Sequence, residues 1–458
     1  MLMKNSCSLA SWSKTAKLKL NIVSAVLATA LTACGGGGSD APIATSTPPI
    51  ADTIPVVPDY QVIGSVIMAH SPLLNFVSAR LDRSDATYVV AAGLLYSSNP
   101  PANHDAPVRV FRVNTDGTGQ DVTGLILEGT ATAATAFPVV ADFNGDGIDD
   151  IFLAGMLDHS GNASGVAWIS REGKQHRRVS LPDLTWSHDV VTVDIDHDGD
   201  LDVVNSHGQM WLNDGVGNFQ FRDHHWNLNF GAGHWMHGSG VCAGDFNRTG
   251  RTQLVITDLM QDGFKSPKAD TVIYELDTAL QPIREHVLPV PTLDRNTTKE
   301  ISHDVTCLVA DVNNDTWPDI LVFSRGWPGN GLWTNDSAVQ VLINRGNWQF
   351  EDVSAQALPG YRTNQHVTYM PIAQDFNGDG LVDLWFSSFD WASGQATSAW
   401  VNRGTGTFAS VLSDPIVSAR ANGGMIPIRS AQGWRLVFAR IQGNTVTFYS
   451  TTVVHRIN

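Results

Sequence analysis

The sequence predicts an all-β protein of the β-propeller type. A nine-residue motif rich in aspartate occurs five times, with its first aspartate at residues 142, 194, 245, 311 and 375. Each copy lies in a unit of short apolar segments; in the second unit these are residues 190–193, 201–204, 209–212 and 219–221. No helical period intervenes, so each unit reads as four strands with turns between them. Repeated four-stranded units of roughly fifty residues are typical of propeller blades.

The first complete motif, residues 142–150, shows why the repeat predicts a metal. Oxygen-bearing side chains stand at positions 1, 3, 5 and 9, position 7 offers a backbone carbonyl, and glycine stands at the bend. Ca²⁺ prefers several oxygen ligands at short range. We call this nine-residue motif the Asp loop. The alternative is a turn that uses Asp and Asn only for local hydrogen bonds, but several carboxylates packed together without a cation would repel one another.

Four Asp loops carry a complete ligand set. The predicted calcium ligands are Asp142, Asn144, Asp146 and Asp150; Asp194, Asp196, Asp198 and Asp202; Asp311, Asn313, Asp315 and Asp319; and Asp375, Asn377, Asp379 and Asp383. In the loop at 311, Thr316 replaces the usual glycine, and we expect strain in that turn. The expected role of the metal is structural, because it would pin the turn between two strands.

The Asp loop at 245 departs from the pattern. Its ligand positions hold Asp245, Asn247, Thr249 and Gln253, so two carboxylates are missing, and Arg251 lies inside the loop. An arginine there could replace the charge of the cation with its own. We therefore predict that this loop is metal-free.

The hairpins that follow the Asp loops carry a family resemblance. Residues 212–219, 343–350 and 401–408 share an Asn, a central Gly and a closing Phe. Together with the Asp loops they resemble FG-GAP/VCBS repeats, which are shared with the integrin α-chain head, over about residues 138–408. The resemblance implies a seven-bladed propeller, with the Asp loop between the first and second strands of a blade.

The flanking sequence completes the count of seven blades. Residues 81–85 and 88–91 form a decayed Asp loop and a strand, whereas 425–430, 434–440 and 445–450 provide three strands without a fourth. Residues 62–68 form a spare strand near the N-terminus. We predict that this strand completes the last blade and closes the ring, because an open sheet edge is an aggregation hazard.

The first 58 residues predict an anchor and a tether. Lys14, Lys17 and Lys19 precede an apolar run from 20 to 31 that is too short to span a membrane. The run ends in Leu-Thr-Ala followed by Cys34, which resembles the lipobox of bacterial lipoproteins; an ordinary secretory leader is the alternative. Residues 1–33 would then be a signal peptide, 34–58 a flexible tether and 59–458 the propeller. The resemblance implies lipidation of Cys34 at the cell envelope, with the outer membrane favoured because Gly35 follows the cysteine.

Charge excludes one class of partner. The chain carries a formal charge of −16, and removal of four lysines with the leader changes this to −20. Nucleic-acid binding proteins need basic surfaces, so DNA and RNA are poor partners.

Beyond Cys34 the mature chain has Cys242 and Cys307, each just before an Asp loop. An oxidising envelope permits a disulfide between them, but two buried free thiols are equally compatible with the sequence.

The ends of the strands opposite the Asp loops concentrate histidine and tryptophan. In four successive blades a histidine stands at the head of the innermost strand, and these four are the catalytic candidates: His188, His237, His303 and His366. The predicted ligand-binding residues at this end, which we call the top face, are Trp186, His188, Asp189, His207, Trp235, His237, His303, Asp304, Arg325, Trp327, His366 and Trp391.

Three interpretations of the top face remain open. The side chains could pack between blades, could bind a glycan or protein by stacking and hydrogen bonding, or could form a catalytic or transition-metal site, since imidazole is a metal ligand and a general base. Propeller-type polysaccharide lyases with histidine at the channel mouth offer an analogy only. The sequence favours a calcium-stabilised ligand-binding or adhesion module. The alternatives are a polysaccharide lyase and a non-catalytic envelope scaffold.

Overall fold

The computed structural model describes most of the chain after residue 58. The described residues are 59–98, 101–135, 137–155, 164–183, 187–223, 238–258, 271–289, 302–326, 337–359, 365–367, 371–390, 395–413, 424–430 and 432–454. The chain divides into two units, Met1–Val56 and Val57–Asn458. All described residues belong to the second unit, so the predicted leader, Cys34 and the tether lie outside them.

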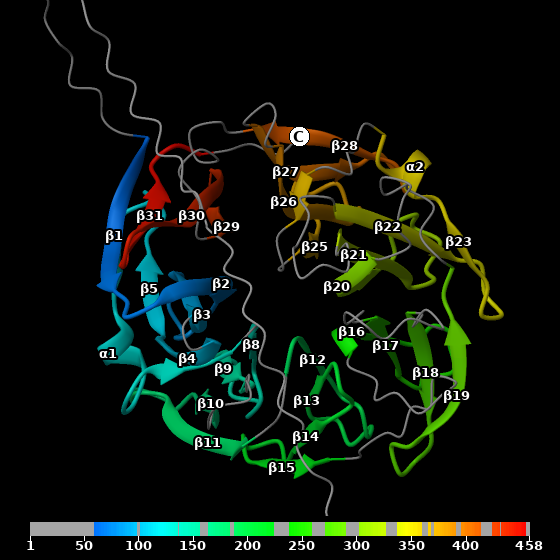
Figure 1. Cartoon of the computed structure of the whole chain (residues 1–458), viewed down its shortest axis with the longest axis horizontal. Coiled ribbons are helices and arrows are strands. Elements are labelled where there is room, and N and C mark those ends of the chain that lie inside the picture. The colour runs from blue at the N-terminus through cyan, green and yellow to red at the C-terminus, as the bar shows by residue number, and fades with distance from the viewer. Residues whose placement is uncertain are drawn as a thin grey trace, which may run out of the picture. The chain divides into compact units, whose positions relative to one another are not determined.

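The described strands of the second unit form seven antiparallel sheets. In Figure 1 these sheets follow one another around a ring, in chain order from blue to red. In the second to fifth blades the four strands pair in sequence order, so each of these blades is a meander. The prediction of an all-β, seven-bladed propeller with four-stranded blades is confirmed.

Blades 1 to 3 hold the N-terminal half of the ring. Blade 1 consists of β2 (Ser71–Ala79), β3 (Thr87–Ser98), β5 (Arg109–Val113) and β6 (Gly119–Asp121), with β4 (Pro101–Pro107) and β7 (Thr132–Ala133) added to the same sheet. Blade 2 consists of β8 (Pro138–Ala141), β9 (Asp150–Leu153), β10 (Ser164–Ile169) and β11 (Arg177–Asp183). Blade 3 consists of β12 (Val190–Val193), β13 (Asp202–Asn205), β14 (Met210–Asn213) and β15 (Phe219–Arg222). The short helix α1 (Thr123–Ile126) follows blade 1.

Blades 4 to 7 complete the ring. Their strands are β16 (Gly238–Gly244), β17 (Gln253–Asp258), β18 (Val272–Leu276) and β19 (Pro282–Val287) in blade 4; β20 (Ser302–Ala310), β21 (Asp319–Gly326), β22 (Ser337–Asn344) and β23 (Phe350–Asp352) in blade 5; β24 (Gln365–Val367), β25 (Ile372–Gln374), β26 (Asp383–Asp390), β27 (Gln395–Asn402) and β28 (Phe408–Ser413) in blade 6; and β29 (Met425–Ser430), β30 (Gly433–Gln442) and β31 (Thr445–Thr451) with β1 (Tyr60–Ile67) in blade 7. The helix α2 (Ser354–Ala357) follows blade 5.

The N-terminal strand closes the ring as predicted. β1 pairs antiparallel with β31, from Tyr60 opposite Thr451 to Ile67 opposite Thr445. The last blade therefore joins the two ends of the propeller, and β1 covers the edge that β31 would otherwise expose.

The hydrophobic core is divided among the junctions between blades. The described residues form seven buried clusters, and each combines strands of two consecutive blades. One cluster packs Phe152 of blade 2 edge-on against Trp211 of blade 3. Ile63 of β1 belongs to the cluster between blades 7 and 1. Sheet-on-sheet packing around the whole ring is what holds the Asp loops in register with one another.

A disulfide joins Cys242 of β16 to Cys307 of β20, with their Cα atoms 5.7 Å apart. This settles the question that the sequence left open, because the innermost strands of blades 4 and 5 place the two residues side by side. Both cysteines are buried in the cluster between these blades.

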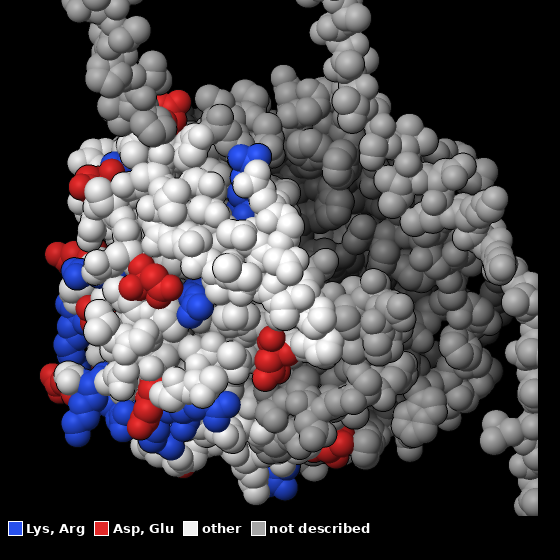
Figure 2. All heavy atoms as spheres, turned by 60° about the vertical axis from the view of Figure 1, so that its left-hand side comes forward, with Lys and Arg blue, Asp and Glu red and all other residues white. Residues whose placement is uncertain are grey.

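The exposed surface is mixed in charge. Figure 2 brings the left side of Figure 1 forward, and the Lys and Arg side chains along its lower edge have Asp and Glu among them. The described residues on this face form no continuous basic surface of the kind that nucleic acids require. Among the described residues, no helix is long and apolar enough to cross a membrane.

Candidate metal centre and the opposite face

The five Asp loops lie where the resemblance placed them, between the first and second strands of blades 2 to 6. The loop at 142, for example, joins β8 to β9, and the loop at 194 joins β12 to β13. All five share one backbone shape, because positions 4 and 6 adopt positive φ in each. Glycine supplies most of these positions, and the exceptions are His197, Arg248, Asn314 and Thr316. Thr316 has φ of 73°, so the predicted strain is present, since a β-branched residue is disfavoured there.

The ninth residue of each complete loop has a structural function that the sequence did not reveal. Asp202 is fully buried, and its two oxygens accept hydrogen bonds from the backbone N–H groups of Ile195 and Asn213. Asp150, Asp319 and Asp383 accept the equivalent pairs of bonds. This carboxylate therefore fastens the start of its own loop to the end of the third strand, whether or not it also contacts a cation.

The first residue distinguishes the loop at 194 from the others. In the loops at 142, 311 and 375, Oδ1 of the first aspartate accepts a hydrogen bond from the N–H of the fifth residue, at 3.0 to 3.2 Å. Oδ1 of Asp194 is instead buried and has no hydrogen-bond partner among the described residues. A buried carboxylate oxygen without a donor is costly, and a bound cation is one way to satisfy it.

Three carboxylates converge on that open oxygen. Asp194, Asp196 and Asp202 each offer an oxygen within 4.8 Å of the others, which is the one such group among the described residues. Burial and the neighbouring carboxylates raise the pKa of Asp202 to about 7. A divalent cation would favour the ionised form and satisfy the open oxygen. All-oxygen donors of this kind fit a hard cation such as Ca²⁺.

The loop at 245 keeps its shape without the missing carboxylates. Gln253 replaces the ninth aspartate, is 2% exposed, and accepts the N–H of Phe246 through Oε1 at 2.7 Å. It thus makes the fastening bond without a charge. The arginine that reaches a neighbouring loop is Arg248, whose Nη2 donates to the carbonyl of Asp315 at 3.2 Å. Arg251, which the sequence suggested as the substitute charge, is exposed.

On the top face the structure brings His188 and His207 together. His188 precedes β12, His207 lies in the turn between β13 and β14, and their ring centroids are 6.2 Å apart. Asp189 is buried rather than open. Its carboxylate accepts bonds from the N–H of Val190 and Val241 and from the hydroxyl of Thr306, at 2.8 to 3.1 Å. Asp189 thereby joins the first strands of blades 3, 4 and 5. These contacts support the packing interpretation of this residue rather than the ligand-binding one.

The remaining top-face predictions are only partly placed. His303 faces Arg325 across the β20–β21 pair, Asp304 faces Ser324, and His366 faces Phe389 across β24 and β26. The side chains of these strand residues lie outside the described part. The predicted residues wholly outside it are Trp186, Trp235, His237, Trp327 and Trp391.

One histidine pair at the same end was missed by the sequence analysis. His70 precedes β2, at the head of the innermost strand of blade 1, and stacks on His104 of β4 with centroids 4.5 Å apart. The sequence signal, a histidine at the head of the innermost strand, was the same as in the other blades. It was overlooked because the Asp loop of blade 1 has decayed.

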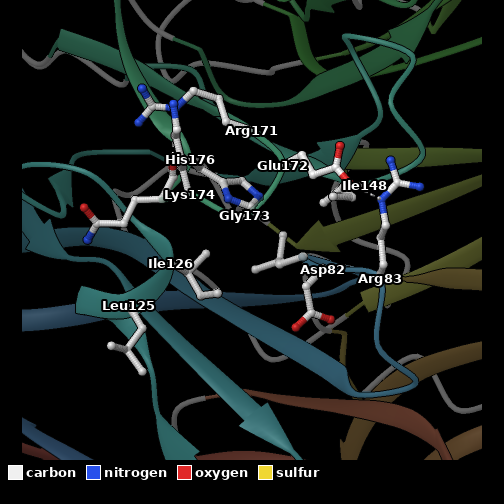
Figure 3. A pocket seen from close by; sticks show the side chains of 12 residues that line it. Asp82, Arg83, Leu125, Ile126, Ile148, Arg171, Glu172, Gly173, Lys174 and His176 are labelled. Atoms are coloured by element: carbon white, nitrogen blue, oxygen red, sulfur yellow. Dashed lines mark hydrogen bonds and ion pairs between the residues drawn. The ribbon is translucent and has the colours of Figure 1, made fainter.

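On the Asp-loop side a cleft of about 620 Å³ lies between blades 1 and 2. Figure 3 shows Asp82 and Arg83 of the decayed loop, Ile126 of α1 and the β10–β11 hairpin residues around it. His176 in its wall is 3% exposed, and its Nε2 lies 3.2 Å from the carbonyl oxygen of Asp149. Burial lowers the pKa of this histidine, so its ring is neutral near pH 7.

A comparison with family models agrees with this repeat architecture. The model for the FG-GAP-like repeat matches residues 88–153, 142–205 and 311–386. This chain contains FG-GAP-like repeats. Each match includes an Asp loop and the second strand that follows it. A search of curated proteins found no sequence match.

Two solved structures are similar to this chain at a low level. The Dos1 propeller has a TM-score of 0.46 and 10% identity, covering 87% of this chain and 97% of that one. The exotype rhamnogalacturonan lyase YesX has a TM-score of 0.33 and 12% identity, covering 87% of this chain and 75% of that one. At these scores the activities of the two proteins do not transfer to this chain.

Proposed function

We propose that the protein is a calcium-stabilised ligand-binding propeller of the cell envelope. The observation that carries the calcium part is the open, buried oxygen of Asp194 beside two further carboxylates. The residues of this loop would hold the ion, and the ion would supply the positive charge that three converging carboxylates require. Its function would be to fix the turn between β12 and β13, so that the strands carry the top-face loops in a defined arrangement.

The calcium proposal is tested with a matched pair of loops. Asp194→Asn should abolish the tightest calcium-binding event in isothermal titration of chelator-treated protein. Asp245→Asn should leave it unchanged, because Asp245 holds the same position and, like Asp194, accepts the N–H of the sixth residue, but in a loop without the full ligand set. In the wild type, EDTA should lower the melting temperature by several degrees. A melting temperature that is insensitive to EDTA and a flat titration would refute the proposal.

The ligand-binding part rests on the lengths of the connections. At the Asp-loop end, third and fourth strands are joined by tight hairpins such as Asn344 to Phe350. At the top end of blades 3 to 5 the connections are much longer, as between Arg222 and Gly238 or between Asp258 and Val272. Long loops on a rigid scaffold are where proteins place binding residues. The first of these connections, residues 223–237, supplies tryptophan and histidine, which suit a glycan or a protein ligand.

A glycan array probed with the mature protein in calcium tests this assignment, followed by protein-partner capture if no glycan binds. Trp235→Ala should weaken binding of any hit at least tenfold, with an unchanged melting temperature. Val216→Ser, a change of a 59% exposed residue in a hairpin at the Asp-loop end, should leave binding intact. Equal binding by both variants would place the ligand elsewhere than the top face.

The alternative function, a polysaccharide lyase, has one observation in its favour. His303 and Arg325 are paired across β20 and β21 at the top end of blade 5, so the strand register brings together a residue type that can act as a base and one that can neutralise a uronate carboxylate. Incubation with acidic polysaccharides should then release unsaturated products, and His303→Ala should abolish release without changing the melting curve. Binding without products leaves the module as a binding protein or scaffold.

We also propose anchoring through a lipid on Cys34, which the lipobox-like residues before it support. Labelled palmitate should be incorporated into the wild type and not into Cys34→Ser, and the variant should move from the membrane to the soluble fraction. Incorporation by the variant would rule out this anchor.

A further inference from the structure

Two ligand-poor loops each send an arginine into the Asp loop of the next blade. In blade 1, Nη2 of Arg83 donates to the carbonyl of Asp146 at 3.1 Å. In blade 4, Nη2 of Arg248 donates to the carbonyl of Asp315 at 3.2 Å and also to the hydroxyl of Thr316. Asp146 and Asp315 are both the fifth residue of their loops, so the same contact occurs at two separate blade junctions. Figure 3 shows Arg83 beside Ile148 of the receiving loop.

Arg248 makes a second interaction with the receiving loop. Arg248 occupies position 4 of its loop with φ of 56°, a region that non-glycine residues adopt at a cost. Its guanidinium lies 4.0 Å from the ring centroid of Trp317, the seventh residue of the receiving loop. The cation–π contact and two hydrogen bonds offset the strain. Arg83 is held from its other side by Glu172, at 3.9 Å.

We propose that Arg83 and Arg248 are built-in cations, which support the loops at 142 and 311 in place of part of the calcium charge. This rests on the calcium proposal above. The loops at 142, 311 and 375 have the Oδ1 atom of their first aspartate bonded to a backbone N–H, whereas Oδ1 of Asp194 has no such partner. Among the described residues, no arginine donates a hydrogen bond to the fifth residue of the loops at 194 and 375. The sites therefore fall into two classes: weak ones at 142 and 311, and arginine-free ones at 194 and 375, of which the open loop at 194 is the tightest.

The physical reason is the sign of the charge. A guanidinium fixed at the fifth carbonyl satisfies a backbone acceptor and balances the nearby carboxylates, so the turn persists without metal. The same positive charge repels an incoming divalent cation over a few ångströms. The arginine thus lowers both the calcium affinity of the loop and its dependence on calcium.

Hydrogen exchange of the mature chain, resolved by peptide and measured with calcium and with EDTA, tests the inference. In the wild type, EDTA should increase exchange in residues 194–202 at least tenfold and in 142–150 and 311–319 much less. Arg248→Gln should make 311–319 respond to EDTA like 194–202 and should tighten its calcium binding about tenfold. Arg251→Gln is the matched control, because it removes the same charge from an exposed position in the same loop.

The possible outcomes separate the two proposals. If residues 194–202 respond to calcium but Arg248→Gln leaves 311–319 as in the wild type, or if Arg251→Gln has the same effect, the built-in cation is wrong. If no loop responds in any variant, the calcium proposal itself fails. Should Arg248→Gln not fold, Arg83→Gln asks the same question of residues 142–150, and Arg248→Lys, which keeps the charge, should preserve the wild-type pattern.

Discussion

At the scale of single residues, one side chain often has two functions, and its type in the sequence reveals only one. The ninth aspartate of an Asp loop is an oxygen donor for a cation and also an acceptor for two backbone N–H groups. Gln253 separates the two functions, since it keeps a backbone bond and gives up the charge. Asp189 shows the opposite case, in which the sequence suggests catalysis and the contacts of the side chain are those of packing between blades. It follows His188 as in a catalytic pair, yet its oxygens are occupied by donors from three blades.

Asp189 makes a prediction about pH. Burial raises its pKa from 3.8 to about 7 in the folded protein. Between about pH 4 and 7 the folded state therefore holds a proton that the unfolded chain has lost, so stability falls as pH rises through this window, by up to about 1.4 kcal/mol per pH unit. Asp189→Asn should flatten this slope in urea titrations at saturating calcium. The exposed Asp85→Asn should retain the wild-type slope, and a retained slope in Asp189→Asn would contradict the assignment.

At the scale of elements, a residue at the end of the third strand in blades 3, 5 and 6 fastens the Asp loop of the blade before it. The Nδ2 atoms of Asn213, Asn344 and Asn402 donate to the carbonyls of Phe143, Phe246 and Val312, at 2.6 to 3.0 Å. In blade 7, Trp434 makes the equivalent bond to Phe376. The hairpin asparagines that carried the family resemblance are thus contacts between blades. Their spacing was readable in the sequence, but their partners, up to 98 residues away, were not.

The disulfide is the covalent fastener at this scale. It closes a sequence separation of 65 residues between the first strands of blades 4 and 5. Its removal in a Cys242→Ser, Cys307→Ser double variant should lower the free energy of unfolding by about 2–4 kcal/mol, because the unfolded chain regains conformational freedom. Urea unfolding measures this. Reductant should shift the wild type toward the variant and leave the variant unchanged; a variant as stable as the oxidised wild type would show that the bond contributes nothing.

At the scale of the whole molecule, stability depends on ring closure. β1 adds the fourth strand to blade 7 and contributes Ile63 and Val66 to the cluster between blades 7 and 1, which Met68 just after the strand also joins. Each blade alone would expose two apolar faces, so the ring gains its full burial only when this last junction forms.

Two isoleucines of β1 test the closure. Ile63 is 4% exposed and Ile67 is 78% exposed. Ile63→Ala should destabilise the propeller by about 2–5 kcal/mol through a cavity at the closing junction, whereas Ile67→Ala should change stability by less than about 0.5 kcal/mol. Chemical denaturation of both variants provides the comparison. Equal stabilities would mean that the closing strand does not bear on global unfolding.

The sequence by itself determined the fold class, the five Asp loops, the strand that closes the ring and the departure of the loop at 245. These follow from local patterns: alternating oxygen ligands, glycine or asparagine at turns, and strand-length apolar segments that repeat. The tertiary structure decided which cysteines pair, why Asp189 is buried, that Arg248 rather than Arg251 reaches the next loop, and that Asp194 alone keeps an open oxygen. Each of these depends on what a neighbouring blade places beside the residue, and a blade boundary brings together atoms whose distance along the chain carries no local signal.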